Sequence, residues 1–294
     1  MVHRRDAETR RKATTSPQNT GPIVVFMLLS LRLCVSPVNL RRGEMRRALR
    51  YHEAMFPYDA TLLAAVQTAP LTIAEVLRIL GEIEATCADT DGLQWFNWLY
   101  LQVTQAVETR VAEGGFADSS WLAELDVQFA RLYFSALQSS LSGRDTPGCW
   151  EVLFQSRNYN AVARIQFALA GINAHINHDL PEAIVATCQA TGSTPEHGGP
   201  HYIDYTALNS TLDGLIESAK STLNVRLPGD ALPPVSRLED TMAAWSVSAA
   251  RESAWQNAAH LWQIRGVPLL TDSFLNTLDG LTTVISKTLL VPVP

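Results

Sequence analysis

The sequence of 294 residues contains few cysteines and no cluster of them. The four cysteines are Cys34, Cys87, Cys149 and Cys188, and no pair has C-x-x-C spacing. We therefore do not expect a structural zinc site built on cysteines. Scattered cysteines are typical of small buried side chains in a reducing compartment, which favours an intracellular, cytoplasmic location.

Positive charge is scarce beyond the N-terminus. The formal net charge is −6, and the basic residues are concentrated in residues 1–50. Proteins that bind nucleic acid usually carry a basic surface, because most of the binding energy comes from contacts with phosphate groups. We therefore expect no nucleic-acid partner.

Long apolar segments are also missing. The run at residues 22–36 is interrupted by Arg32 and is too short to span a bilayer. We interpret residues 1–58 as a basic, partly disordered N-terminal extension. The alternatives are an organellar or membrane-associated segment that acts through residues 22–36, or a helix that packs on the rest of the chain.

Motifs of several enzyme classes do not occur. The chain has no alternating strand pattern, no glycine-rich dinucleotide or phosphate loop and no G-x-S-x-G elbow, so nucleotide-binding α/β folds and α/β-hydrolases are not indicated. It also lacks a D-D-x-x-D run and an E-x-x-H pair, which argues against a prenyl-diphosphate site and a di-iron bundle.

Helical periodicity is the dominant pattern after residue 58. It predicts one all-α domain at residues 59–294, an orthogonal or irregular bundle of about seven or eight helices around a buried central helix. The predicted helices are Ile73–Thr86, Leu93–Val111, Trp121–Leu141, Trp150–Phe154, Tyr159–Asp179, Pro181–Ala190, Tyr202–Leu223, Arg237–Arg265 and Asp272–Leu289.

The segment Tyr159–Asp179 is apolar on nearly every side, which is typical of a helix in the middle of a bundle. At 100° per residue, Arg164, Gly171 and His175 share one face, and Asn177 points to the opposite side. Small residues on that face leave space, filled either by a closely packed neighbouring helix or by a ligand. Asp179 is expected to cap the helix that follows.

His175 is the most informative residue of this segment, and three roles are open. It is a neutral core histidine, a general acid or base, or a ligand of one divalent metal. His175 and Asp179 lie four positions apart, so their side chains meet on adjacent turns. His201 and Asp204, three positions apart at a helix start, are the candidates for further metal ligands. Asp204 could instead serve the helix dipole.

Other polar side chains occur in apolar surroundings. Asn97 lies within a run of aromatic residues that includes Tyr100. Arg251 and Trp255 lie four positions apart, so the guanidinium can stack on the indole. For Asp126, as for Asp91, a helix cap or a surface position is the preferred interpretation.

Four blocks of the sequence carry a resemblance to a known family. They are Asp91-Gly92-Leu93 with Phe96-Asn97-x-Leu99-Tyr100-x-x-Val103-Thr104, Leu125-Asp126-x-x-Phe129-Ala130-x-x-Tyr133, Asn173-Ala174-His175-Ile176-Asn177-x-Asp179-Leu180-Pro181, and Arg251-Glu252-x-Ala254-Trp255. Together they resemble an uncharacterised microbial family of helical proteins, known only as a domain of unknown function. The resemblance implies a single helical domain in which His175, Asn177 and Asp179 belong to the family pattern, whereas the position of His178 is free.

These observations favour an enzyme of specialised metabolism that acts on a small, largely apolar metabolite by cyclisation, isomerisation or hydrolysis. His175, Asp179 and Asn177 are the predicted catalytic residues, with no cofactor or one divalent metal held by His175, Asp179, His201 and Asp204. The alternatives are a carrier of a lipid-like or terpenoid-like molecule and a structural protein with a buried polar network. The predicted substrate-binding residues are Arg164, Asn97, Tyr100, Arg251, Trp255 and Gly171.

Overall fold

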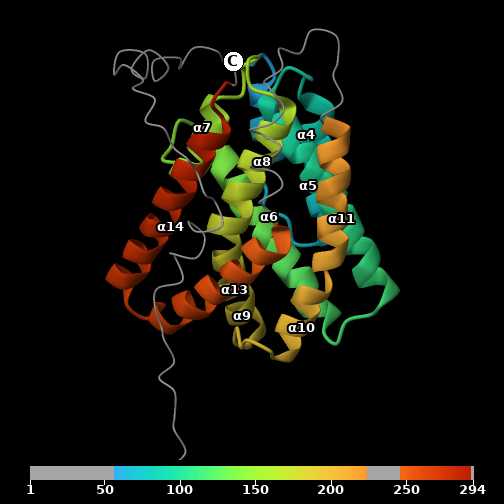
Figure 1. Ribbon diagram of the computed structural model, residues 1–294, viewed down its shortest axis with the longest axis vertical. Helices are drawn as coiled ribbons and strands as arrows, with labels where there is room; N and C mark the ends of the chain where they lie inside the picture. Colours follow the sequence, from blue (N-terminus) through green and yellow to red (C-terminus); the bar gives the residue numbers. More distant parts are fainter. Residues whose placement is uncertain (1–55, 224–245, 293–294) are drawn as a thin grey trace, which may run out of the picture.

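The computed structural model describes residues 56–223 and 246–292 (Figure 1). Within these ranges the helices are joined by turns and loops and there is no β-strand, which confirms the predicted all-α class. The apolar run at residues 22–36 and the first part of the helix predicted at Arg237–Arg265 lie outside the described residues. No helix within the described ranges is long and apolar enough to cross a membrane.

Helix starts follow the polar capping residues of the sequence. A side-chain oxygen at such a position accepts a hydrogen bond from a backbone N–H of the first turn, which has no partner inside the helix. Thr72, for example, accepts from the N–H of Glu75 at 3.2 Å. The helices that begin in this way are α4 (Ile73–Thr86) after Thr72, α5 (Gly92–Glu113) after Asp91 and α6 (Ser119–Leu141) after Asp118.

The central helix begins later than predicted, at Arg164 instead of Tyr159. Residues 159–162 form a turn in which the N–H of Val162 donates to the carbonyl of Tyr159. Tertiary contacts explain this start, because the carbonyl of Arg157 accepts from the N–H of Gly92 and so holds the preceding backbone against α5. Helical periodicity contains no information about such a contact.

The predicted break before Pro181 does not occur. The helix α8 (Arg164–Ala174) continues through a π-helical turn, η1 (His175–Asp179), into α9 (Leu180–Thr191). In that turn the N–H of Leu180 donates to the carbonyl of His175, five residues earlier. A π turn disrupts the regular bonding ladder, so a proline without an N–H is accommodated there. Asp179 therefore does not cap a new helix, and its side chain is available for other contacts.

The segment α8–η1–α9 lies in the middle of the bundle, with α14 (Pro268–Leu289) on one side and α5 on the other (Figure 1). Every residue of α8 after Arg164 is buried, as predicted for a central helix. The π turn lies beside α6, α13 (Val247–Ile264) and α14. Two shorter helices complete this side of the fold, α3 (Asp59–Ala65) and α7 (Gly148–Gln155).

The helix predicted at Tyr202–Leu223 is divided at Leu208 into α10 (Pro200–Ala207) and α11 (Asn209–Leu223). In an unbroken helix the carbonyl of Tyr205 would accept from the N–H of Asn209. Here that carbonyl accepts from the guanidinium of Arg251 at 2.8 Å, and the side chain of Asn209 accepts from the same guanidinium. A side chain from α13 thus competes with helix continuation.

Candidate functional site

The π turn brings two histidines to one carboxylate. The Nδ1 atom of His175 lies 2.9 Å from one oxygen of Asp179, and the Nδ1 atom of His178 lies 2.8 Å from the other. The indole N–H of Trp150, on α7, donates to both oxygens at 3.0 and 3.2 Å. All four side chains are buried, so Asp179 is a fully bonded carboxylate in the interior.

Electrostatics separate the two histidines. Burial alone would raise the pKa of Asp179, but hydrogen bonds and charge from His175 and His178 hold it below its ordinary value. Burial lowers the pKa of His175, and its contacts with Asp179 offset only part of that effect. Burial also acts to lower the pKa of His178, but Asp179 and the nearby acidic groups raise it to about 9. At neutral pH, His175 is therefore neutral and His178 is cationic.

The protonation pattern of His175 follows from its partner. An ionised carboxylate only accepts hydrogen bonds, so the proton of the neutral ring is on Nδ1, which donates to Asp179. Nε2 then carries a lone pair. This Nε2 is buried and has no hydrogen-bond partner among the described residues. A buried nitrogen that could accept a proton is thus held in a fixed orientation without a protein partner.

Aromatic rings surround His175. Phe129 lies flat on the imidazole, with ring centroids 3.4 Å apart and planes 5° apart. Tyr100 meets it edge-on with a centroid distance of 4.6 Å. The rings of Phe96, Tyr133 and Trp150 lie further out, at 5.8 to 6.2 Å. We call His175 and these five residues the aromatic centre.

Further buried polar atoms lie at or near this centre. The hydroxyls of Tyr100 and Tyr133 have no hydrogen-bond partner within the described residues. Burial raises the pKa of both phenols well above the ordinary value, so both hydroxyls stay protonated at neutral pH. A buried polar atom without a partner costs about 1–3 kcal/mol, so several such atoms close together are unusual in a folded interior.

The space predicted beside Gly171 is filled by a neighbouring helix. A Cβ built at Gly171 would lie 2.2 Å from Cγ of Phe96. Of the two alternatives for the small-residue face, close packing therefore holds at this position. Arg164, at the other end of α8, places its guanidinium 4.3 Å above the ring of Trp95 and is away from His175.

Three other predicted residues have partners elsewhere in the fold. The amide of Asn97 donates to the carbonyl of Leu80 at 2.9 Å, although its oxygen has no partner among the described residues. The guanidinium of Arg251 lies 3.8 Å above the ring of Tyr205, so the predicted stacking on Trp255 is replaced by stacking on a tyrosine of α10. The described ring contacts of Trp255 likewise involve α6 and α10.

Asn177 belongs to a different network from His175. Its amide donates to the side-chain oxygen of Asn173 at 2.8 Å. Asn173 in turn donates to the carbonyl of Thr282 and to the hydroxyl of Ser286, both on α14. As the helical geometry predicted, the two asparagines point away from the His175 side. Their bonds connect the central helix to α14 and do not involve Asp179.

The four predicted metal ligands do not come together. Asp204 accepts from the backbone N–H groups of Ala117 and Asp118, at 2.9 and 2.7 Å, and so holds the start of α6. His201 stacks on Trp121 at the N-terminal end of that helix. Phe129, which stacks on His175, lies eight residues further along α6, or about 12 Å at 1.5 Å per residue. The structure thus separates this pair from His175 and Asp179.

Sequence reasoning missed several residues of the centre. From the sequence, Phe129 and Tyr133 were noted only within a block that carries the family resemblance, and Trp150 only as the first residue of a predicted short helix. Asp126, expected as a cap or surface residue, is 8% exposed on α6, and one of its oxygens has no partner in the described chain. The sequence does contain a pattern that could have grouped these residues. Asp126, Phe129 and Tyr133 have the i, i+3, i+7 spacing that puts side chains on one face of a helix.

The fold and this centre define a class of protein, an all-α bundle with a buried histidine–carboxylate centre at a π turn. The chain belongs to a family described as a family of unknown function (DUF5995), whose model matches residues 73–292. The match includes every helix from α4 to α14 and therefore the whole aromatic centre. Comparisons with curated proteins and with solved structures gave no match.

Proposed function

We propose that the protein is an enzyme that acts on a small, largely apolar molecule, with His175 as its general acid or base. The observation that carries this proposal is the state of Nε2, which is buried, has no partner among the described residues and bears a lone pair. A histidine held at Nδ1 by a carboxylate and free at Nε2 is the arrangement that proton-transfer enzymes use.

The neighbouring groups support distinct roles in proton transfer. Asp179 keeps the proton of the neutral ring on Nδ1 and stabilises the imidazolium that forms when Nε2 accepts a proton. Trp150 holds the carboxylate in place through its indole N–H. The neutral hydroxyls of Tyr100 and Tyr133 are donors for an oxygen on which negative charge develops.

The surroundings also favour a class of substrate. Because Phe129 covers one face of the imidazole, a substrate reaches Nε2 along the edge of the ring. The rings of the aromatic centre favour an apolar molecule with one hydrogen-bonding group for Nε2. Cyclisation, isomerisation and hydrolysis each need one positioned proton donor or acceptor, so all three remain within the proposal.

The test compares His175→Ala with His197→Ala, which changes an exposed histidine in the loop before α10 whose partner is Glu252. Each protein is incubated with a small-molecule extract of the source cells, and mass spectrometry follows which components are consumed. Wild type and His197→Ala should convert the same component, and His175→Ala should be slower by about 10²–10⁴-fold.

Three outcomes would contradict the proposal. If His175→Ala keeps the wild-type unfolding temperature and converts the component at the wild-type rate, His175 is not the acid or base. If all three proteins retain a component without changing it, the protein is a carrier. A large loss of stability in His175→Ala without any conversion by wild type would indicate a structural network instead.

A further inference from the structure

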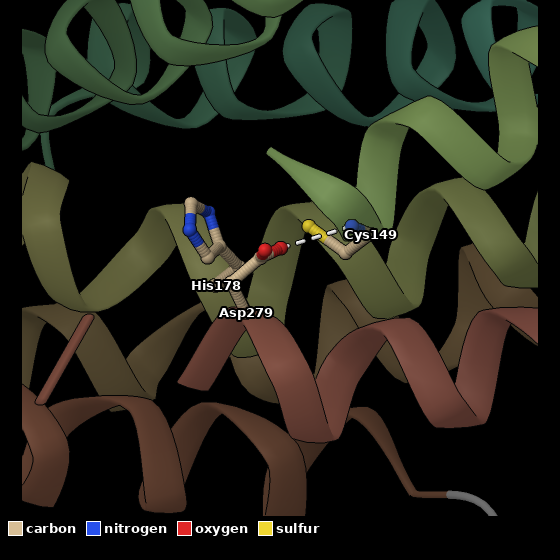
Figure 2. A group of neighbouring side chains, drawn as sticks. All are labelled: Cys149, His178 and Asp279. Atoms are coloured by element: carbon tan, nitrogen blue, oxygen red, sulfur yellow. Dashed lines mark hydrogen bonds between the residues drawn. The ribbon is translucent and has the colours of Figure 1, made fainter. Parts of the chain in front are cut away.

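A second group of side chains lies on the other side of Asp179. Cys149, His178 and Asp279 come from α7, η1 and α14, and each offers a ligand atom within 4.8 Å of the others (Figure 2). Glu182, on the first turn of α9, places Oε1 3.9 Å from Nε2 of His178. The sequence did not point to Cys149, Asp279 or Glu182 as metal ligands; the spacing of His178 from His175 suits a metal, but the resemblance left that position free. The aromatic centre uses none of the four residues.

We propose that Cys149, His178, Asp279 and Glu182 bind one divalent transition-metal ion of the zinc type. Thiolate, imidazole and carboxylate are the donors that Zn²⁺ binds in proteins, and four protein ligands complete its tetrahedral coordination. Cys149, His178 and Asp279 form the core of the proposed site, and Glu182, close to His178, supplies the fourth ligand that makes it a closed, structural site.

The bonding of His178 supports this assignment. Its Nδ1 is fixed by Asp179, which is the carboxylate–histidine arrangement that orients metal-binding imidazoles. Its Nε2 makes no hydrogen bond within the described chain, since 3.9 Å to Glu182 is beyond hydrogen-bond distance. The residue as a whole is 7% exposed, and its imidazole lies in one group with the ligand atoms of Cys149 and Asp279.

The carboxylate of Asp279 has capacity for a cation in addition to its present bonds. Its two oxygens accept from the backbone N–H groups of Gly148 and Cys149, both at 2.9 Å, which positions the cysteine beside it (Figure 2). An ionised carboxylate has about four acceptor positions, so each oxygen can also bind a metal. In a zinc site neighbouring ligand atoms lie about 3.5 Å apart, whereas here those of Cys149, His178 and Asp279 lie within 4.8 Å of one another. Rotation of the side chains can bring the ligand atoms to the shorter separation.

The acidic groups around His178 also favour a bound cation. Asp179 lies 2.8 Å from Nδ1 of His178, Glu182 lies 3.9 Å from its Nε2, and Asp279 belongs to the same group of ligand atoms, so three acidic groups surround one imidazole. A divalent cation compensates this excess of negative charge and joins the π turn to α7, α9 and α14. The alternative without a metal is a histidine cation that pairs with these carboxylates, and the experiment below distinguishes the two.

The test is titration of the tag-free, full-length protein, stripped with a chelator, with Co²⁺ and then Zn²⁺. Wild type should bind one equivalent of Co²⁺ with a near-ultraviolet thiolate-to-cobalt charge-transfer band, and Zn²⁺ should displace it. Cys149→Ala should lose that band, and His178→Gln should weaken Zn²⁺ binding at least 100-fold. Cys188→Ala, which removes a buried cysteine outside the group, should behave as wild type.

Several results would overturn the proposal. Wild type that binds no equivalent of metal, or binds Co²⁺ without the charge-transfer band, has no cysteine-containing site. Unchanged Zn²⁺ affinity in Cys149→Ala would assign the metal to other residues. If Cys149→Ala or His178→Gln does not fold, Glu182→Gln provides the comparison, since its side chain is 28% exposed. It should bind Zn²⁺ at least 10-fold more weakly, and unchanged affinity removes Glu182 from the site.

Discussion

At the scale of single residues, Asp179 determines what both histidines do. It accepts from His175, His178 and Trp150, so one carboxylate fixes the orientation of both imidazole rings. Which nitrogen of His175 stays free depends on this bond and not on any property of the histidine itself. The role of a residue in this centre is therefore a property of its neighbours.

Asp126 provides a test of the buried polar atoms at this scale. Burial, with a smaller contribution from Glu108, raises the pKa of its carboxyl to about 7. The folded protein therefore keeps a proton that the unfolded chain loses near pH 4, and the free energy of unfolding falls as pH rises from about 4 to 7. Asp126→Asn removes this dependence.

We expect Asp126→Asn to match wild type near pH 4 and to exceed it at pH 8. The gain is on the order of 3–4 kcal/mol, at about 1.4 kcal/mol per pKa unit. Urea unfolding at a series of pH values measures the difference. Asp145→Asn, in an exposed loop, should keep the wild-type slope. A slope in Asp126→Asn equal to that of wild type would show that Asp126 ionises normally in the fold.

Sequence reasoning was most successful for single residues with local partners. Asp91 caps α5, one of the two positions expected for it, and Thr72 and Asp118 are capping residue types that cap α4 and α6, because a cap and the N–H groups it binds are close in sequence. Asp126 was misinterpreted, since its surroundings come from distant parts of the chain. For Asp179 the contact with His175 was predicted from the spacing of four, but the cap was wrong, because the helix continues through the π turn and Trp150 of α7 also binds the carboxylate.

At the scale of helices, the π turn is the decisive element. It keeps α8 and α9 in one continuous helix and gathers His175, His178 and Asp179 at its centre. One side of the helix packs against Phe96 of α5, and the opposite side is bonded to α14 through Asn173. The interface between α8 and α5 depends on Gly171, because a side chain there would overlap Phe96.

Gly171→Ala tests that interface. The new Cβ would overlap the ring of Phe96, which is held by its own aromatic neighbours, so we expect a loss of about 1–3 kcal/mol in the free energy of unfolding. Gly214→Ala on α11, where nothing lies within 4 Å, should be neutral or stabilising by up to about 1 kcal/mol. Thermal or urea unfolding compares the two.

A double variant then shows whether the stability lost in Gly171→Ala comes from the contact with Phe96. In Phe96→Leu with Gly171→Ala the smaller side chain makes room, so part of the stability lost in each single variant should return. If the two losses simply add, the alanine acts through another contact. If Gly171→Ala is as stable as wild type, the packing of α5 on α8 is looser than the structure shows.

At the scale of the whole molecule, a buried ion cluster connects the beginning of the described chain to its centre. Arg157, just after α7, donates to Asp91 at 2.6 and 2.9 Å and to Asp59 at 3.0 Å. Asp91 is at the same time the cap of α5, and Asp59 begins α3. Because the guanidinium joins these elements, its removal should affect the whole fold.

Arg157→Met is expected to lower the free energy of unfolding by about 3–5 kcal/mol, because it leaves two buried carboxylates without their cation. Arg78→Met breaks only an exposed pair with Glu82 and should cost less than about 1 kcal/mol. Equilibrium unfolding of both variants measures the contrast. Similar small losses in the two variants would mean that solvent reaches the Arg157 cluster.

The sequence by itself determined the class of fold, the helix starts at capping residues and the central position of the histidine segment. All of these depend on periodicity and on partners a few residues apart, which a linear pattern records. The tertiary structure alone decided that the helix continues through a π turn, that Phe96 fills the space beside Gly171, and that His201 and Asp204 belong elsewhere. These outcomes depend on contacts between residues far apart in the chain, whose free energies exceed the local preferences that they override.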